Sequence, residues 1–207
     1  MKIFFDVDGV LMNNIHMKRG WLNRWDKDIE KDLGIAPEKF QEIFHDWFLK
    51  VQIGQLDFEE SMDRWLKFHG YNAAASHVIE YWNQKDMNLN EDLWPAIRSL
   101  SQNANIELYV ATNQSHARAN HLWQNGFKDH FKKIYYSAAL SCFKQDGNYF
   151  RQIEEELGFD PRKETVLFFD DDERNVKVSS ERGWNAVCFD THADVVNHPL
   201  IQPLLVS

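Results

Sequence analysis

In the stretch "MKIFFDVDGV", residues 1–10, two aspartates follow immediately after an apolar run. The letters IFF are continuously apolar, which is typical of a strand covered on both faces of a parallel sheet. If the strand continues, Asp6 and Asp8 point to the same face, where their carboxylates repel each other. A cation between them, or a proton kept by one of them, relieves that repulsion. The alternative interpretation is a plain strand end, with Gly9 supplying the turn.

Length and charge restrict the class of protein. The 207 residues suffice for one domain with a substantial insertion or for two small domains. A net charge of −9 argues against nucleic acid or an anionic membrane as the main partner. No stretch approaches the ~20 apolar residues of a membrane span, and the two cysteines suggest neither a disulfide framework nor a zinc site. We therefore expect a soluble cytoplasmic protein.

The chain after the first strand has a helical period. "WLNRWDKDIEKDLG" (21–34), "PEKFQEIFHDWFLK" (37–50) and "DFEESMDRWLKFHG" (57–70) carry apolar residues three or four apart and contain no strand candidate. Several of the eight tryptophans lie in this part, and we expect them to fill a small helical core rather than to stack on a ligand. The pattern predicts an inserted helical cap domain at 14–87.

Strands and helices alternate in the remainder, which predicts crossover connections and a mainly parallel sheet. The predicted strands are "IELYVAT", "KIYYS", "TVLFFD" and "AVCFD", and the predicted helices surround "EDLWPAIRSLSQ", "SHARANHLWQNG", "QDGNYFRQIEEELG" and "ERNVKVSSERG". The first strand should join this sheet. We therefore predict an α/β fold with a doubly wound, Rossmann-like parallel sheet, whose core domain comprises residues 1–13 and 88–207.

Chemically competent residues follow three of these strands. They are Asp6 with Asp8, Thr112 with Asn113, and the run from Asp170 to Asp172. Ligands of open parallel sheets bind outside the carboxyl ends of the strands, so these residues should meet at one edge. Carboxylates without a suitably spaced histidine or cysteine favour magnesium. His116 and His121 are interpreted as structural or exposed, and Cys142 as inert.

A carboxylate at this edge can also attack phosphorus and form an aspartyl-phosphate. Asp8 can hold a proton for the leaving oxygen, because the charge of Asp6 beside it raises its pKa. The transferring phosphoryl group needs donors and a cation around it. Thr112 offers a hydroxyl and Lys144 an ammonium. The chain lacks GxGxxG and GxxxxGK(S/T), which argues against use of NAD or ATP.

Taken together, the motifs resemble the haloacid dehalogenase-like (HAD) hydrolases over essentially the whole chain. "DVDGV" resembles the first motif, "VATN" the second, Lys144 in "SCFKQDG" the third and "LFFDDDERNV" the fourth, in the family's order. The inserted helices resemble the small helical cap that some members carry after the first strand. Two features depart from the pattern: Gln145 follows Lys144 where members often have proline, and three successive aspartates obscure the register of the fourth motif.

The resemblance implies a role for each motif residue. Asp6 is the nucleophile, Asp8 the general acid and base, and Lys144 the group that neutralises Asp6 and phosphate. Thr112 donates a hydrogen bond to phosphate, and Asn113 adds a substrate contact. Magnesium is bound by Asp6, by the main-chain carbonyl of Asp8 and by Asp170, with Asp171 close behind. Asp172 is then the N-cap of the following helix.

We therefore predict a magnesium-dependent phosphatase that hydrolyses a small phosphorylated metabolite, a sugar phosphate being plausible. The acid at Asp8 favours phosphate chemistry, because dehalogenating members of the family lack an acid there. A phosphomutase of sugar phosphates with the same aspartates is the alternative enzyme. A regulatory module that only binds metal and phosphate is a third interpretation, less favoured because a binder does not require both a nucleophile and an adjacent acid.

Overall fold

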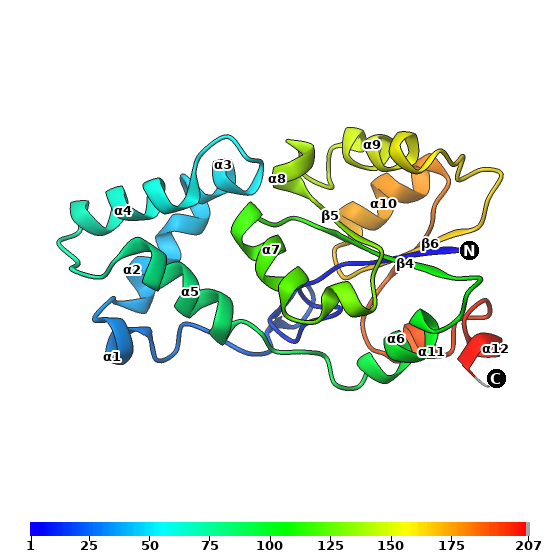
Figure 1. Cartoon of the computed structure of the whole chain (residues 1–207), viewed down its shortest axis with the longest axis horizontal. Coiled ribbons are helices and arrows are strands. Elements are labelled where there is room, and N and C mark those ends of the chain that lie inside the picture. Colours follow the sequence, from blue (N-terminus) through cyan, green and yellow to red (C-terminus); the bar gives the residue numbers. More distant parts are fainter. Residues whose placement is uncertain (206–207) are drawn as a thin grey trace.

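The computed structural model describes residues 1–205 and contains an α/β core with a helical insertion (Figure 1). The central sheet is parallel throughout and has the order β5-β4-β1-β6-β7. Its strands are β1 (Lys2–Phe5), β4 (Glu107–Thr112), β5 (Lys133–Tyr136), β6 (Val166–Asp170) and β7 (Asn185–Cys188). The predicted fold class, a doubly wound parallel sheet, is confirmed. β1 lies in the middle because its apolar side chains must be covered on both faces.

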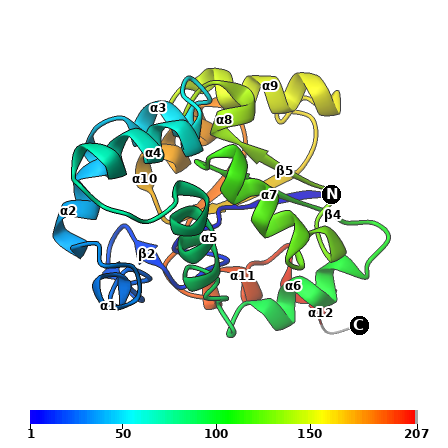
Figure 2. The ribbon, with the colours of Figure 1, turned by 60° about the vertical axis from the view of Figure 1, so that its left-hand side comes forward.

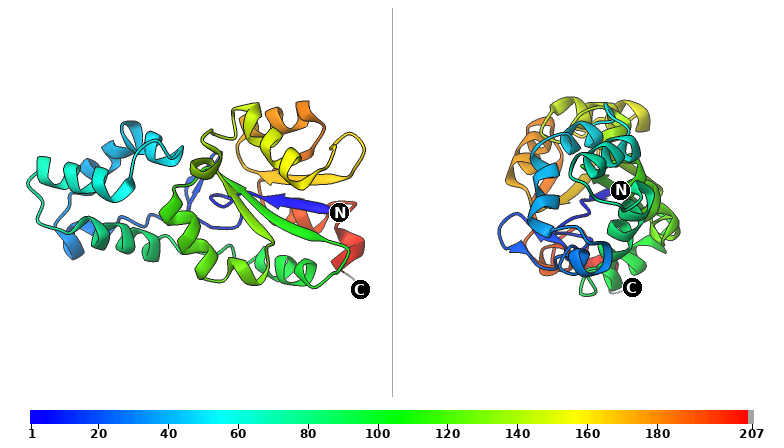
Figure 3. Two further views of the ribbon diagram at one scale, coloured as in Figure 1. Left: turned by 45° about the horizontal axis from the view of Figure 1, so that its top comes forward. Right: turned by 90° about the vertical axis from the view of Figure 1, so that its left-hand side faces the viewer.

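Helices cover both faces of the sheet, as Figure 3 (left) shows. The core helices are α6 (Trp94–Ser101), α7 (His116–Gln124), the 3-10 helix η2 (Phe127–Asp129), α8 (Ser137–Leu140), α9 (Gly147–Leu157), α10 (Glu173–Arg182), α11 (Ala193–Val196) and α12 (Gln202–Leu205). None of the helices in the described part of the chain has the length and apolarity needed to cross a membrane.

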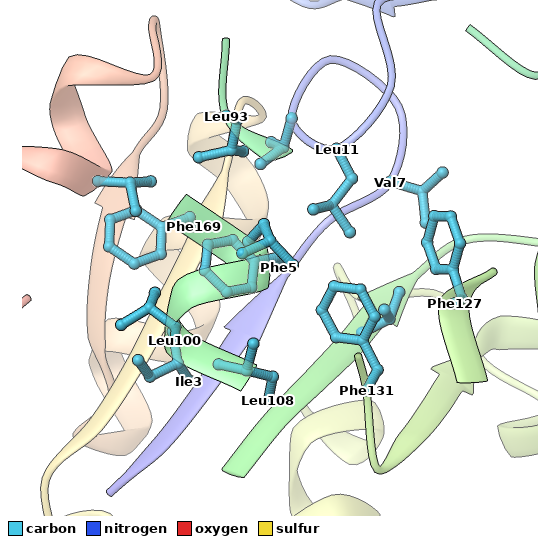
Figure 4. Close-up of a cluster of buried hydrophobic side chains, with 14 of the residues drawn as sticks. Ile3, Phe5, Val7, Leu11, Leu93, Leu100, Leu108, Phe127, Phe131 and Phe169 are labelled. Atoms are coloured by element: carbon cyan, nitrogen blue, oxygen red, sulfur yellow. The ribbon is translucent and has the colours of Figure 1, made fainter. Parts of the chain in front are cut away.

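Alternate residues of β1 enter different cores. Ile3 and Phe5 pack with side chains of α6 and with Phe131 (Figure 4). Phe4 points to the opposite face, where its ring lies 4.6 Å from that of Trp184 in a cluster that includes residues of α9. This two-sided burial fixes the register of the strand, since a slip of one residue would exchange the two sets of side chains.

The insertion has a hydrophobic core of its own. It contains β2 (Ile15–His16), β3 (Gly20–Trp21), α1 (Ile29–Leu33), α2 (Pro37–Gln41), the 3-10 helix η1 (Glu42–His45), α3 (Phe48–Gln52), α4 (Phe58–Phe68) and α5 (Ala75–Lys85). Its buried tryptophans and phenylalanines form a cluster separate from those of the sheet. α3 contacts α8, and α5 contacts α7 (Figure 2). We refer to this insertion as the cap; the boundaries at 14 and 87 stay a prediction.

Two local predictions in the cap were wrong. A short hairpin, β2 with β3, pairs Ile15 with Trp21 where no strand was expected. The predicted helix at 21–34 is therefore shortened to Ile29–Leu33, because Trp21 belongs to the hairpin. Gly20 allows the sharp return, since its φ of 73° is a conformation that residues with a side chain rarely adopt. The helical period alone did not reveal this tertiary pairing.

Candidate active site

Three strand ends converge at one edge of the sheet. Phe5 of β1 lies opposite Val110 of β4 and Phe169 of β6 in the parallel registers. The backbone N–H of Asp6 extends the pairing by donating to the carbonyl of Phe169 at 2.9 Å. Asp6, Thr112 and Asp170 therefore emerge side by side, as the alternation of strands and helices predicted.

Lys144 joins two of the strands. Its Nζ lies 2.7 Å from Oδ2 of Asp6 and 2.7 Å from Oδ2 of Asp170, and its side chain is 1% exposed. The loop that carries Lys144 is held by Asn113, whose Oδ1 accepts a hydrogen bond from the Lys144 backbone N–H at 3.0 Å. Gln145, where family members often have proline, lies near Asn113 and donates to Asp172 at 3.3 Å. Asn113 thus helps to position the lysine; its predicted contact with substrate stays a prediction.

The charges of this group are not balanced. Asp6, Asp170 and Asp171 are buried, and each offers a carboxylate oxygen within 4.8 Å of the others. Burial raises the pKa of Asp6 well above its usual range, although Lys144 opposes the shift. Burial alone would lower the pKa of Lys144, but Asp170 and Asp6 raise it above the ordinary value. Three carboxylates around one ammonium leave an excess of negative charge when all are ionised.

Asp170 is already saturated with donors. Its oxygens accept hydrogen bonds from the Asp172 backbone N–H at 2.8 Å and from Asn175 Nδ2 at 3.0 Å, besides the ammonium of Lys144. Asp172 begins α10, and its side chain accepts from the backbone N–H of Arg174, which confirms its predicted role as the N-cap. These donors hold the Asp170 side chain against Lys144 and occupy both of its oxygens.

Asp171 is less occupied and faces the first motif. Its Oδ2 accepts one hydrogen bond of 2.7 Å from the backbone N–H of Met17 in the turn of the hairpin. A Cβ on Gly9 would lie 2.2 Å from this same oxygen, so only glycine allows the chain to pass here. Burial raises the pKa of Asp171 to about 7, an effect to which Asp170 adds.

Asp8 is not one of the three carboxylates in this cluster. β1 ends at Phe5, and the chain turns, with the Leu11 backbone N–H donating to the carbonyl of Asp6. Asn14 and Gln114 donate to the two oxygens of Asp8 at 3.0 and 2.6 Å. Sequence reasoning did not select these two amides. Gln114 is two residues beyond Thr112 and could have been noticed for that reason, whereas Asn14 is recognisable only in three dimensions.

Thr112 ends β4 at the same edge and is buried. Its carbonyl accepts a hydrogen bond of 3.3 Å from the hydroxyl of Tyr149, a residue that sequence reasoning also missed. The predicted role of its own hydroxyl as a phosphate donor stays a prediction. His116 is exposed, as expected, and burial raises the pKa of the Cys142 thiol, in keeping with an inert cysteine.

A cavity of about 380 Å³ opens beside Asp8 and extends between the sheet and the cap. Its wall includes Trp25, Phe48 and Trp82 of the cap and Gln114 of the core. A second cavity, of about 470 Å³, lies between the cap and α7, and none of the aspartates described above lines it. We therefore take the smaller cavity as the one that serves the site.

Comparison with known families finds a match over most of the chain. The family model for haloacid dehalogenase-like hydrolases matches residues 3–178. The chain belongs to this family. Its HAD core and its cap, inserted between β1 and β4, agree with the predicted membership. No curated protein matches the chain.

Solved HAD structures share the fold at low sequence identity. A HAD family enzyme from Bacteroides thetaiotaomicron, in complex with magnesium and inorganic phosphate, is 22% identical with a TM-score of 0.70, over 92% of this chain and 94% of that one. A predicted HAD-like hydrolase from Porphyromonas gingivalis is 20% identical with a TM-score of 0.72, covering 100% and 98%. L-2-haloacid dehalogenase from Xanthobacter autotrophicus is 18% identical with a TM-score of 0.61, covering 99% and 85%. These likenesses concern the fold alone.

Proposed function

We propose that this HAD hydrolase is a magnesium-dependent phosphatase that acts on a small phosphorylated metabolite through an aspartyl-phosphate. The observation that carries the proposal is the group of Asp6, Asp170 and Asp171 around one ammonium, with Asp8 beside it at the cavity. A nucleophile, an acid and an excess of negative charge next to a cavity are the parts that phosphoryl transfer requires.

The residues present fit a magnesium ion. Magnesium prefers oxygen ligands and is commonly held by one or two carboxylates together with water and substrate phosphate. The raised pKa values of Asp6 and Asp171 mark carboxylates whose charge is not compensated by protein groups alone. When bound, the ion would neutralise these charges and those of the phosphoryl oxygens. The similar Bacteroides enzyme is known as a complex with magnesium and inorganic phosphate.

The hydrogen bonds favour an exchange of roles between Asp170 and Asp171 at the end of β6. The sequence interpretation gave the metal to Asp170 and placed Asp171 behind it. Asp170 is saturated by Lys144, Asn175 and the Asp172 N–H, whereas Asp171 carries a single backbone hydrogen bond. We therefore propose that Asp6, Asp171 and the main-chain carbonyl of Asp8 hold the ion, and that Asp170 fixes Lys144.

The chemistry assigns separate tasks to Asp6 and Asp8. The Asp6 carboxylate attacks phosphorus, and the bond from phosphorus to the ester oxygen breaks as Asp8 gives its proton to that oxygen. Asp8 then accepts a proton from the water that cleaves the aspartyl-phosphate, so that free phosphate and an alcohol result. Asn14 and Gln114 hold the Asp8 carboxylate at the cavity wall. Lys144 and the hydroxyl of Thr112 would stabilise the charge on the transferring group.

The test is phosphate release from a panel of phosphorylated metabolites and p-nitrophenyl phosphate, with magnesium present. Asp6→Asn should abolish turnover, a loss of many orders of magnitude, while Asp63→Asn, on the exposed face of the cap, should leave it unchanged. Equal turnover by wild type and Asp6→Asn would overturn catalysis at this site. Conversion of one sugar phosphate into an isomer without release of phosphate would identify a phosphomutase instead. Binding of phosphate without any turnover would indicate a regulatory module.

A further inference from the structure

The cavity beside Asp8 is where the leaving group of a substrate must lie, because Asp8 is the proposed proton donor to the ester oxygen. This inference therefore rests on the proposed function and concerns the alcohol that the enzyme releases. The volume of about 380 Å³ is within the usual range of small-molecule sites. The chemistry of the wall then decides which alcohol fits.

Aromatic rings form much of the wall. Trp82 is at the centre of the cluster, with its ring 5.1 Å from that of Trp25, 5.3 Å from that of Phe44 and 5.1 Å from that of Phe48. Trp21 lines the cavity from the hairpin and is 40% exposed, with no ring contact to another aromatic side chain in the described residues. These rings present flat apolar surfaces, which form favourable contacts with another ring at stacked or edge-on geometry.

Three side-chain amides of the wall are already engaged within the protein, whereas Trp82 Nε1 and Arg118 Nε are buried without a partner in the described structure. Gln41 donates to Asp26 at 2.6 Å, Gln52 to the Asn113 carbonyl at 3.3 Å and Gln114 to Asp8 at 2.6 Å. The amide of Asn14 donates twice, to Asp8 and to the Asp86 carbonyl, while its Oδ1 is buried without a partner in the described structure. These few unpaired atoms suit a ligand with one or two polar groups, whereas a polyol would bury its remaining hydroxyls against aromatic rings, which is unfavourable.

The charges of the wall disfavour a second anionic group. Asp8 and Asp86 both line the cavity. Among the described residues of the wall, Arg118 is the one arginine, and there is no lysine. The two terminal nitrogens of Arg118 are engaged, with Asp86 Oδ2 at 3.0 Å and with the carbonyls of Asn83 and Asp86, while its Nε has no partner in the described structure. Among the described residues that line the cavity, no lysine and no second arginine is present to receive a carboxylate or a second phosphate.

We propose that the physiological substrate is the phosphate ester of an alcohol that carries a planar aromatic ring without negative charge. The ring would lie among Trp21, Phe44 and Trp82, and the ester oxygen would lie next to Asp8. The phosphorus–oxygen bond of the ester breaks during transfer to Asp6, and the aromatic alcohol leaves with the proton of Asp8. This substrate class differs from the sugar phosphates that sequence analysis found plausible.

Two substrates of nearly equal size distinguish the effect of an aromatic ring from the effect of its volume. Benzyl phosphate and cyclohexylmethyl phosphate share a primary ester oxygen, but only the first is flat and aromatic. We expect wild-type kcat/KM to favour benzyl phosphate over cyclohexylmethyl phosphate about 3- to 10-fold, the range that one aromatic contact supplies. Glycerol phosphate should be poorer than both by at least about tenfold, because it buries no apolar area. Trp21→Ala and Phe44→Leu should each bring the ratio of kcat/KM for benzyl phosphate to kcat/KM for cyclohexylmethyl phosphate towards one.

Phe68→Ala is the matched control, because Phe68 is 84% exposed on the cap and does not line the cavity. Its preference for benzyl phosphate over cyclohexylmethyl phosphate should equal that of wild type. Phe44→Leu preserves the test if Trp21→Ala disturbs the hairpin. Hydrolysis of all three esters without preference for the ring would overturn the inference and leave the phosphatase proposal standing.

Equilibrium binding of benzylphosphonate and cyclohexylmethylphosphonate gives a readout that needs no turnover. Tighter binding of the aromatic phosphonate, reduced in Trp21→Ala and Phe44→Leu, is the expected result. If no ester is hydrolysed but this selectivity is present, the proposed reaction fails and the ring site stands. Equal binding of the two phosphonates would overturn the ring site, whatever the enzyme hydrolyses.

Discussion

Replacing Lys144 with methionine should destabilise the fold strongly, because it leaves two buried carboxylates without their cation. Lys144 Nζ lies 2.7 Å from both Asp6 and Asp170, whose side chains are 10% and 0% exposed. Removing one partner of a buried ion pair typically costs about 3–5 kcal/mol. Methionine preserves most of the volume of the lysine side chain, so this loss would report the charge rather than a cavity.

The loss should also depend on pH. The raised pKa of Lys144 means that its contribution is fully present below its unfolded pKa, hence throughout the range in which the aspartates titrate. Without the lysine, Asp6, whose pKa is already raised by burial, escapes the penalty by taking a proton in acid. The free energy of unfolding lost in Lys144→Met should therefore be larger near pH 8 than near pH 5. We expect the two losses to differ by at least about 1 kcal/mol, which corresponds to a change of less than one unit in the pKa of Asp6.

Urea unfolding with a chelator present, at both pH values, measures this difference. Lys133→Met is the matched control, because Lys133 pairs with Glu156 at 2.6 Å while both side chains are 47% exposed. An exposed pair of this kind contributes about 0.2–1 kcal/mol. Equal losses of stability in Lys144→Met and Lys133→Met near pH 8 would refute the reasoning that the buried lysine compensates two charges.

Three further predictions concern the metal, the acid and pH. Asp171→Asn should raise the magnesium concentration for half-maximal activity by at least about tenfold, the usual minimum for a disturbed metal site. The increase should be larger than in Asp170→Asn. The reverse order in a magnesium titration would return the metal to Asp170, as the sequence suggested. Asp8→Asn should lower kcat about 10²- to 10⁴-fold for an alkyl ester, and much less for p-nitrophenyl phosphate, whose leaving group needs no proton; equal losses in steady-state assays would argue against Asp8 as the acid. Because burial raises the pKa of Asp171 to about 7 from 3.8, the metal-free protein should lose stability as pH rises from about 4 to about 7. This loss of stability should be smaller in Asp171→Asn. Magnesium binds the ionised carboxylates, so its thermal stabilisation should be greater near pH 8 than near pH 5.5, and an equal shift at both pH values would contradict this assignment.

The core of the fold was predictable from local features of the chain. The apolar run before Asp6 could be covered only in the middle of a sheet, and the alternation after residue 90 required crossovers between parallel strands. Asp172 was predictable as an N-cap because a side chain there reaches the N–H groups of the next turn. The residues at the strand ends were found for the same reason, since parallel strands bring their carboxyl ends to one edge.

The contacts that tune the site were not predictable in this way. Asn14, Gln114 and the Met17 N–H approach Asp8 and Asp171 from segments whose spacing along the chain carries no signal. The hairpin that supplies Met17 was missed, because its two short strands are stabilised by pairing and not by their period.

Local periodicity and the chemistry of single residues were enough to predict the order of strands and helices in the core, the insertion of a cap after β1 and the types of side chain at the strand ends. Three features became visible only in the folded chain: Lys144 compensates Asp6 and Asp170, Asp171 has one hydrogen-bond donor, and aromatic rings of the cap share a cavity with Asp8. Charge compensation and cavity shape depend on distances between segments that are far apart in the chain, and no local pattern encodes those distances.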